Sequence, residues 1–281
     1  MPSASAYQLI DFGGGARLER FGDRVVDRPH PGALGERADP AAWTRADLRF
    51  DRDRGWSGPA LPAGAWPFAH ERLRLELRPT DAGQVGLFPE HLGTLDWLQS
   101  CVERRAASGR RLSVLHLFAY TGLATLAMAA AGAEVTHVDA SRPTVAWARR
   151  NAGLSGLSDG PIRWIVDDAV EFADREVRRG RKYAGVVLDP PTYGHGPRSR
   201  PWRLEADLER LLASCAVLLE RGGFVLVTAH TPGFDAGRLG SLIATTLGLP
   251  DCGCETGELE VTASDERSLE LGAFARAAGT A

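Results

Sequence analysis

The sequence predicts an α/β protein built on a doubly wound parallel sheet, preceded by a small β-rich module. From about residue 91, short apolar runs alternate strictly with stretches whose apolar residues have helical spacing. Such alternation is typical of a parallel sheet with helices on both faces. The first 80 residues instead hold short alternating runs between glycine-rich breaks, which indicate an antiparallel meander. We therefore expect a β-rich module over 1–80 and a larger domain over 81–281.

The N-terminal module is expected to begin with three strands, at "YQLID", "ARLERFG" and "DRVVDRP". A further alternating strand is predicted over 71–79, in "ERLRLELRP". The turn sequence "TDAGQ" follows it, so we expect "VGLFP" to pair with that strand.

The larger domain begins with a helix after residue 91 and then alternates. Its strands are predicted at 112–118, 134–140, 162–166, 183–189 and 223–229. Its other helices are predicted at 122–131, 142–153, 168–179, 204–220 and 236–247. The closing runs "CETGELEVTAS" and "RSLELGAFARA" predict an antiparallel C-terminal strand pair.

Composition narrows the class of protein. The chain has 281 residues, 44% hydrophobic and 25% charged, which is typical of a soluble globular protein. Its formal charge of −3 gives no overall basic field for nucleic acid. The four cysteines are too irregular for a disulfide framework or a zinc site, so we expect reduced thiols and no metal. No signal pattern or transmembrane-length run is present, so we expect a cytoplasmic protein with no membrane partner.

The carboxyl ends of the predicted parallel strands are where a doubly wound sheet binds ligands. The first strand leads into a turn with Thr121 and Gly122, whose free N–H groups favour an anion. The second ends at Asp139, which is placed to accept hydrogen bonds from ribose hydroxyls. The third ends at Asp167 and Asp168. One of these acids alternatively caps the next helix, and Asp168 is the better candidate for contact with an adenine amino group.

The fourth strand ends in Asp189, Pro190 and Pro191, where the prolines prevent further strand pairing. The alternative to a site is a simple strand stop. Because Asp189 stands on the same edge as the other acids, we interpret the loop as part of the site. Tyr193 follows and is a candidate for stacking on a base, although a packing role is the alternative.

Nearby polar residues carry weaker signals. His195, His230 and the arginines at 198, 200 and 203 are either cleft residues or solvated loop residues. Trp202 is a candidate for a cleft wall.

The loop after the first strand limits the ligand. It has a single glycine where the dinucleotide fingerprint G-x-G-x-x-G requires three, and no G-x-x-x-x-G-K-[ST] is present. The pattern therefore favours an adenine nucleoside with a small charged end, and S-adenosylmethionine (SAM) fits that description. A short-chain NAD oxidoreductase is disfavoured by the same loop and by the lack of a Tyr-x-x-x-Lys pair.

Two segments, "VLHLFAYTGLATLAMAAAGAEVTHVDASRPTVAWARRNAGLSGL" and "VLDPPTYGHG", resemble class I SAM-dependent methyltransferases. More narrowly, they are similar to the bacterial 23S rRNA large-subunit methyltransferases that modify cytosine C5 or guanine N7. The resemblance covers about residues 70–275 and includes "GLFPEH". It implies a Rossmann-like fold, SAM as cofactor, and an RNA substrate with rRNA favoured.

The resemblance also implies roles for individual residues. It implies contacts to the methionine end of SAM from four residues of the first loop, Phe118, Ala119, Thr121 and Gly122. It implies a ribose contact for Asp139 and an adenine contact for Asp168. It places the reactive methyl group near Asp189, Pro190 and Pro191, with Phe88 bordering the same pocket.

One departure from that family bears on mechanism. Cytosine-C5 members carry a nucleophilic cysteine just after the fifth strand, where this chain reads "VTAHTPGF" with His230 and no cysteine. Covalent attack on cytosine usually needs a thiolate, and Cys215 on the preceding helix is expected to pack against the sheet. Methylation of a nitrogen needs only an aligned lone pair and a proton acceptor. We therefore favour a nucleobase nitrogen in RNA. The alternatives are a small-molecule methyltransferase and an inactive nucleoside- or RNA-binding protein.

Overall fold

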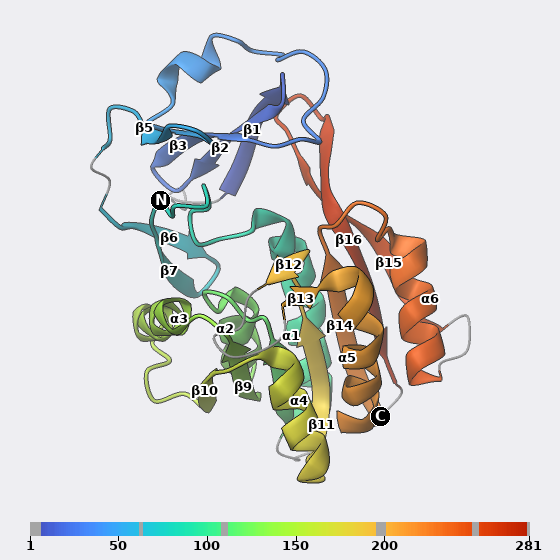
Figure 1. Ribbon diagram of the computed structural model, residues 1–281. Helices are drawn as coiled ribbons and strands as arrows, with labels where there is room; N and C mark the ends of the chain where they lie inside the picture. Colours follow the sequence, from blue (N-terminus) through green and yellow to red (C-terminus); the bar gives the residue numbers. More distant parts are fainter. Residues whose placement is uncertain (1–6, 62–63, 108–111, 195–200, 249–252, 280–281) are drawn as a thin grey trace. The chain divides into compact units, whose positions relative to one another are not determined.

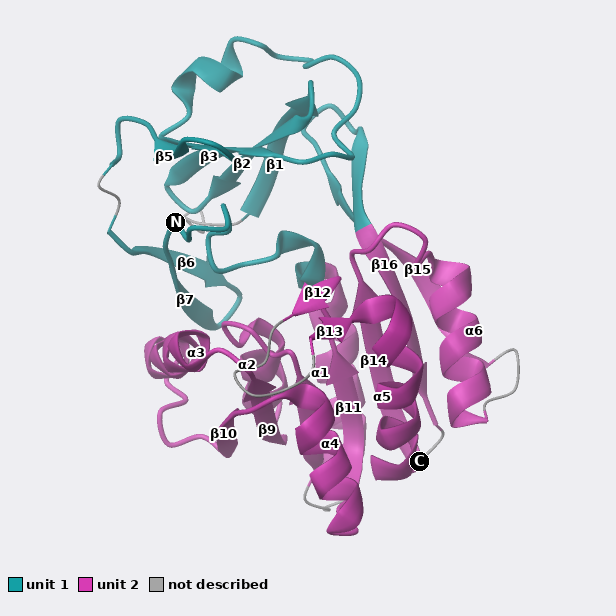
Figure 2. Cartoon of the chain, in the orientation of Figure 1, with its two compact units in different colours: residues 1–92, 260–271 teal, residues 93–259, 272–281 magenta. Residues whose placement is uncertain are grey.

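The computed structural model describes residues 7–61, 64–107, 112–194, 201–248 and 253–279. Within them the chain forms two compact units (Figure 2). Unit 1 comprises Met1–Leu92 and Glu260–Leu271, and unit 2 comprises Gly93–Leu259 and Gly272–Ala281. The sequence places the first boundary near residue 80. In the structure unit 1 continues to Leu92, and within this unit Arg28 donates a hydrogen bond of 2.9 Å to Gln84.

Unit 1 is built on a five-stranded sheet with the order β1-β2-β3-β4-β5 (Figure 1). These strands are β1 (Tyr7–Gly13), β2 (Ala16–Phe21), β3 (Arg24–Pro29), β4 (Leu48–Asp51) and β5 (Gly55–Ser57). The three-strand meander predicted from the sequence is confirmed. Two short 3₁₀ helices, η1 (Ala42–Arg45) and η2 (Pro89–His91), complete the unit together with a separate hairpin.

The hairpin of unit 1 corrects one expectation. Strand β7 (Leu73–Leu77) pairs with the preceding strand β6 (Trp66–His70), and not with the following "VGLFP" segment. The pairing closes tightly, with His70 opposite Leu73. The segment after β7 returns through only a few backbone hydrogen bonds, including Arg78 N–H to Val85 O at 3.0 Å. It then leaves the extended conformation at Gly86, whose φ is 93°. The predicted strand at "VGLFP" therefore does not form, because the backbone turns at Gly86.

Unit 2 contains a seven-stranded sheet with the order β10-β9-β8-β11-β14-β16-β15. Its strands are β8 (Ser113–Leu117), β9 (Glu134–Asp139), β10 (Ile162–Val166), β11 (Tyr183–Leu188), β14 (Leu219–Ala229), β15 (Glu255–Thr262) and β16 (Ser268–Ala278). The first five in this order are parallel, and β16 runs antiparallel to β14. The predicted doubly wound sheet with an antiparallel C-terminal pair is confirmed. The tip of that pair, Glu260–Leu271, is counted with unit 1.

Alternate residues of the same strands enter two different apolar cores, as expected for a sheet covered on both faces. Val186 and Leu188 belong to a core with α4 and α5, whereas Val187 belongs to a core with α1 and α2. The helices are α1 (Leu92–Ala106), α2 (Leu123–Ala130), α3 (Arg142–Leu154), α4 (Ala169–Arg178), α5 (Leu204–Leu218) and α6 (Ala236–Leu247). Each agrees with its prediction to within two residues at either end. Among the residues described, we find no helix with the length and apolarity needed to span a membrane.

The strand order reverses between β8 and β11, which are neighbours in the sheet although β9 and β10 separate them in sequence. In doubly wound sheets this switch point opens a crevice beyond the carboxyl ends of the strands. The loop after β8 and the Asp-Pro-Pro loop after β11 therefore leave the sheet at the place where a ligand is expected.

Two further short strands, β12 (Tyr193–Gly194) and β13 (Trp202–Arg203), pair antiparallel just beyond β11. They hold the chain on either side of residues 195–200 together. His195, Arg198 and Arg200 lie outside the described residues.

Candidate active site

The loop after β8 has an unusual backbone. Phe118 and Tyr120 adopt positive φ values of 54° and 48°, a region that non-glycine side chains rarely occupy. Two hydrogen bonds hold it there. The N–H of Ala119 donates to Val138 O at 3.0 Å, and the N–H of Tyr120 donates to Asp139 Oδ2 at 2.9 Å. Such conformations persist where the surrounding structure enforces them, often at ligand sites.

Gly122 ends this loop and caps helix α2, with φ 92°. A Cβ at this position would lie 3.2 Å from the Cβ of Ala148 on α3, so both the backbone angle and the close approach favour glycine. Thr121 beside it is buried, and its carbonyl accepts a hydrogen bond of 3.0 Å from Asn151 Nδ2. The first turn of α2 is thereby fixed from α3, with its N-terminus at the switch point.

Asp139 stands at the end of β9 and is held by two backbone amides. Its Oδ2 accepts from Tyr120 N–H, and its Oδ1 accepts from Ser141 N–H at 2.9 Å. Burial raises the pKa of this carboxyl, and the two hydrogen bonds offset part of that rise. Because a carboxylate oxygen has two lone pairs, each Asp139 oxygen retains one beyond its amide contact. Asp139 therefore has the capacity to accept from two adjacent hydroxyls.

The two acids after β10, Asp167 and Asp168, have different partners. Asp168 is the N-cap of α4, where its Oδ1 accepts from the N–H groups of Val170 at 2.9 Å and Glu171 at 3.1 Å. Asp167 forms an ion pair with Arg175. Of the two alternatives that the sequence leaves open, Asp168 is the cap. It remains at the same strand end, so an adenine contact is still a prediction for this residue.

Asp189 lies at the end of β11 and is half-buried. Its Oδ1 accepts a hydrogen bond of 2.6 Å from the Thr228 hydroxyl on β14, and His230 Nε2 lies 3.1 Å from the same oxygen. The side chains of Asp189 and His230 are 22% and 27% exposed. This acid is therefore oriented by the neighbouring strand and still reaches solvent. Thr228 was not singled out from the sequence, since a threonine in a buried run gives no signal of its partner.

The Asp-Pro-Pro loop is anchored to the first loop through an aromatic contact. The indole of Trp202 donates to Pro191 O at 2.7 Å, and its ring lies 5.1 Å from that of Phe118, centroid to centroid. Trp202 is 6% exposed and belongs to the core, so it holds the Asp-Pro-Pro loop against the core of unit 2. Tyr193 projects outward, 72% exposed. An aromatic ring held on a short strand pair and open to solvent offers a face for stacking.

A buried polar chain under α2 was not found from the sequence. His116 Nδ1 and Thr125 Oγ1 are 2.7 Å apart, and Thr125 Oγ1 and His137 Nδ1 are 2.9 Å apart. Burial, with His116 and Arg149 adding to it, lowers the pKa of His137 well below 6.5. This imidazole is therefore neutral at physiological pH. The two histidines occupy corresponding positions on β8 and β9, which are paired in register, but neither stands at a strand end.

The described cysteines are unsuited to nucleophilic attack. Cys215 is 1% exposed within the core between α5 and the sheet, and burial raises its pKa to about 12. Burial also raises the pKa values of Cys101 and Cys254. Cys252 lies outside the described residues. A thiol with a raised pKa is almost entirely protonated near neutral pH, whereas the thiolate is the reactive form.

The site residues predicted from the sequence fall into two groups: those at the strand ends of unit 2, and Phe88 in unit 1. Contacts among the strand ends link the first loop with Asp139 and with the loop that begins at Asp189. Phe88 belongs to unit 1, where it is the N-cap of η2 and its ring lies 6.2 Å from that of His91. Its contact with the proposed cofactor site stays a prediction.

Comparison with known proteins gives a consistent result. Residues 45–244 match the family model described as S-adenosylmethionine-dependent methyltransferase. The crystal structure of the SAM-dependent methyltransferase from Agrobacterium tumefaciens is 36% identical, with a TM-score of 0.90 over 99% of this chain and 92% of that one. The methyltransferase SMU.776, solved with SAH, is 17% identical, with a TM-score of 0.72 over 94% of this chain and 72% of that one, and shares the fold.

Curated relatives include the ribosomal RNA large subunit methyltransferase K/L of Methylococcus capsulatus, 33% identical over 148 residues. The corresponding protein of Stutzerimonas stutzeri is 35% identical over 153 residues. These alignments cover 52% and 54% of this chain but only 19% and 20% of the relatives. The chain thus matches about a fifth of the length of these relatives.

Proposed function

Because the chain belongs to the S-adenosylmethionine-dependent methyltransferase family, we propose that it transfers a methyl group from SAM to a nucleobase nitrogen in RNA, with rRNA as the favoured substrate. We place this activity in the cytoplasm, where ribosomal RNA is found. The observation that carries the proposal is the half-buried Asp189 carboxylate, oriented by Thr228 beside the switch point of the sheet.

SAM is the cofactor of the family, and the residues at the strand ends fit it. When bound, SAM supplies an electrophilic methyl group. In the proposal the spare lone pairs of Asp139 accept from the ribose hydroxyls, and Asp168 lies at the adenine end. Phe118, Ala119, Thr121 and Gly122 surround the methionine end, where the N-terminus of α2 favours its carboxylate.

In the proposal, the Asp189 carboxylate accepts a hydrogen bond from the target nitrogen and then accepts the proton that this nitrogen loses. An exocyclic amino nitrogen donates N–H groups, and a carboxylate within hydrogen-bond reach both aligns that nitrogen and accepts the proton that it loses. Thr228 fixes the orientation of Asp189 from β14. Pro190 and Pro191 limit the backbone freedom of the loop, so its carbonyls stay in place as further acceptors.

The raised pKa values of the three described cysteines favour nitrogen over cytosine C5. A C5 reaction needs a nucleophile that adds to the ring, and the described cysteines have raised pKa values. Attack by a nitrogen lone pair needs no covalent enzyme intermediate and no metal ion. The exposed ring of Tyr193 supplies the stacking face that an unpaired base requires.

The experiment uses tritium-labelled SAM and rRNA purified from a strain that lacks this gene. We expect near-stoichiometric transfer into that RNA and little transfer into rRNA of the parent strain, whose target is already methylated. Tyr193→Ala should weaken RNA binding by about 1–3 kcal/mol, while Tyr193→Phe should retain it, because stacking needs only the ring. An enzyme that binds SAM but labels neither RNA, and instead labels a small molecule from a cell extract, would contradict the RNA substrate.

A further inference from the structure

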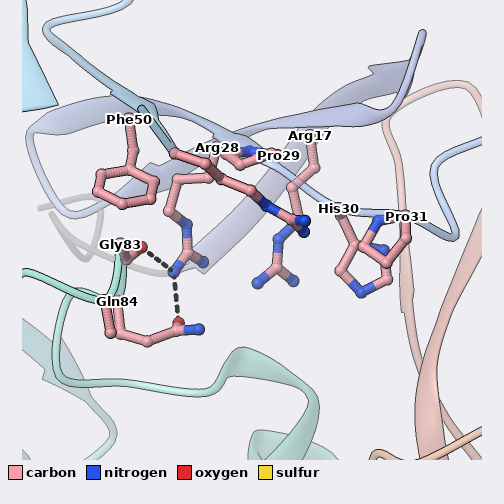
Figure 3. A pocket seen from close by; sticks show the side chains of 10 residues that line it. Arg17, Arg28, Pro29, His30, Pro31, Phe50, Gly83 and Gln84 are labelled. Atoms are coloured by element: carbon pink, nitrogen blue, oxygen red, sulfur yellow. Dashed lines mark hydrogen bonds between the residues drawn. The ribbon is translucent and has the colours of Figure 1, made fainter. Parts of the chain in front are cut away.

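Unit 1 contains a pocket of its own. It has a volume of about 400 Å³ and is lined by residues of unit 1 alone. Its polar lining consists chiefly of Arg17, Arg28, His30, Arg52 and Gln84, with Phe50 and two prolines as apolar walls. In Figure 3 the guanidinium groups of Arg17 and Arg28 extend from the sheet into the same space.

Arg17 and Arg28 face each other directly across β2 and β3. Two like charges in such a position repel, so a counterion is needed. Glu19 supplies it, since a spacing of two residues along β2 places Glu19 on the same face as Arg17. Its Oε2 accepts from Arg28 Nε at 2.8 Å and from Arg28 Nη2 at 2.6 Å. Tyr7 donates to the other oxygen at 3.1 Å.

Arg28 is fully committed to the fold. Besides its two bonds to Glu19, its Nη1 donates to Gln84 Oε1 at 2.9 Å (Figure 3). Arg17 is different. It is 5% exposed, and its Nε and Nη1 are buried without a hydrogen-bond partner among the described residues. Its Nε lies 3.3 Å from Glu19 Oε2, which forms an ion pair without hydrogen-bond geometry. A buried N–H donor without an acceptor lowers the stability of the fold. A ligand with an acceptor atom near this guanidinium would therefore gain hydrogen bonds.

The charges around the pocket favour an anion. Among the residues that the structure describes, three arginines contribute to its lining and no carboxylate does, and Glu19 lies behind Arg17 and Arg28 as their counterion. Burial alone would lower the pKa of Arg17, but the carboxylates of Glu19 and Glu90 raise it above its ordinary value, so Arg17 stays charged. His30 Nδ1 accepts from Gly32 N–H at 3.2 Å, so a neutral His30 carries its proton on Nε2 and is a donor there. Guanidinium groups match phosphate oxygens in both charge and geometry.

The size and the apolar walls indicate more than an inorganic ion. The volume of about 400 Å³ falls within the range of about 300–1,000 Å³ that is typical of sites for small molecules. Phe50 is held against Trp56, with ring centroids 5.1 Å apart, and Gly83 packs on its ring. A ribose or base attached to the phosphate would contact this wall.

We propose that this pocket of unit 1 binds the phosphate group of a nucleotide, with Arg17 and Arg52 as its ligands and Phe50 beside the sugar or base. The phosphate belongs either to an RNA strand or to a free mononucleotide. The proposal goes beyond the methyl-transfer function, because it concerns binding by residues outside unit 2.

The test measures binding by calorimetry to the full-length protein, using inorganic phosphate, AMP and a short single-stranded RNA in separate titrations. Arg52 is exposed at the pocket and Arg54 is exposed on the same turn but does not line it, which makes Arg54→Ala a matched control. Arg52→Ala should weaken binding of the responsive probe about three- to tenfold, and Arg54→Ala less than about twofold. Arg17→Gln should weaken it by more than about tenfold, because it removes the buried donors.

The arms of the test separate the two sources. A loss of RNA affinity, with a salt dependence reduced by about 0.7 in the log–log slope, assigns the pocket to an RNA phosphate. A loss for AMP alone assigns it to a free nucleotide. SAM binding, measured in parallel, should be unchanged in every variant. If Arg52→Ala and a folded Arg17→Gln bind all three probes as the unaltered protein does, the phosphate pocket is wrong, whether or not the enzyme methylates RNA.

Discussion

In unit 1 the carboxylate of Glu19 is fully buried and joins two arginines, whereas in unit 2 the carboxylates of Asp139 and Asp189 are half-buried at the ends of strands. Glu19 has charged partners on its own sheet. Asp139 is held instead by backbone amides, and Asp189 by a hydroxyl and an imidazole. Glu19 balances charge inside a fold, whereas Asp139 and Asp189 are the acids for which we propose contacts with cofactor and substrate.

Burial and partner type therefore lead to different expectations for the buried counterion Glu19 and for the two acids that we propose as site residues. Removing a buried counterion leaves uncompensated charge, so its effect should fall on stability. Removing an acid that neutral donors hold leaves the fold nearly intact, so its effect should fall on binding or rate. Substitutions in the two units should therefore differ in whether they lower stability or lower binding and rate.

The largest effect is expected at Asp189. Asp189→Asn keeps the shape of the side chain and removes the proton acceptor, so the turnover number should fall by about 10²–10⁴-fold. SAM affinity should change little, because the proposed contact of this residue is with the acceptor substrate and not with the cofactor. Stopped-time methyl-transfer assays and calorimetry measure the two quantities. Asp174→Asn, which alters an acid bound to Arg210 and Ser214, is the control. Equal losses in rate and in SAM affinity would mean that Asp189 serves the cofactor.

The next effect concerns stability in unit 1. Glu19→Gln should lower the free energy of unfolding by about 3–5 kcal/mol, because it leaves Arg17 and Arg28 buried opposite each other without the carboxylate that both of them contact. Urea unfolding followed by fluorescence measures it. Glu36→Gln, at an exposed position of the same unit, should change stability by less than about 0.5 kcal/mol. A Glu19→Gln protein as stable as the control would show that the charge balance lies elsewhere.

A smaller effect is expected for the cofactor. Asp139→Ala should weaken SAM binding by about 1–3 kcal/mol through loss of hydrogen bonds to the ribose hydroxyls. Asp159→Ala is the control, because Asp159 is exposed ahead of β10, at the amino end of the strand. Calorimetric titration with SAM and with SAH distinguishes them. Unchanged affinity in Asp139→Ala would remove this residue from the cofactor site.

The smallest effect is a pH dependence in the core of unit 2. The folded state lowers the pKa of His137 below 6.5, so the unfolded chain binds the proton more readily. Stability due to neutral His137 is therefore present above pH 6.5 and is lost as the pH falls, by at most about 1.4 kcal/mol per pH unit. Unfolding titrations between pH 7 and pH 5 should show a shallower fall in His137→Gln than in the unaltered protein. Parallel slopes would contradict this.

The strand ends of unit 2 were predictable because each acid directly follows its own apolar strand. Asp139 and Asp189 are local signals, and the parallel topology alone brings them to one edge. The pairing of Asp189 with Thr228 was not predictable, because it joins residues far apart in sequence. The Arg17–Arg28 contact depends on the register of a hairpin, and "ARLERF" does not reveal that both faces of that strand are covered. The predicted strand at "VGLFP" was wrong because Gly86 adopts a positive φ, which the sequence pattern does not reveal.

The position of the methyl group in the product distinguishes nitrogen methylation from a reaction at cytosine C5 that passes through a covalent enzyme intermediate. The labelled rRNA is digested to nucleosides, and each labelled nucleoside is identified by mass spectrometry against standards. We expect the label in a base methylated on a ring or exocyclic nitrogen, with equal yield from a Cys215→Ala enzyme. Label in 5-methylcytidine, lost when Cys215 is replaced, would contradict nitrogen methylation.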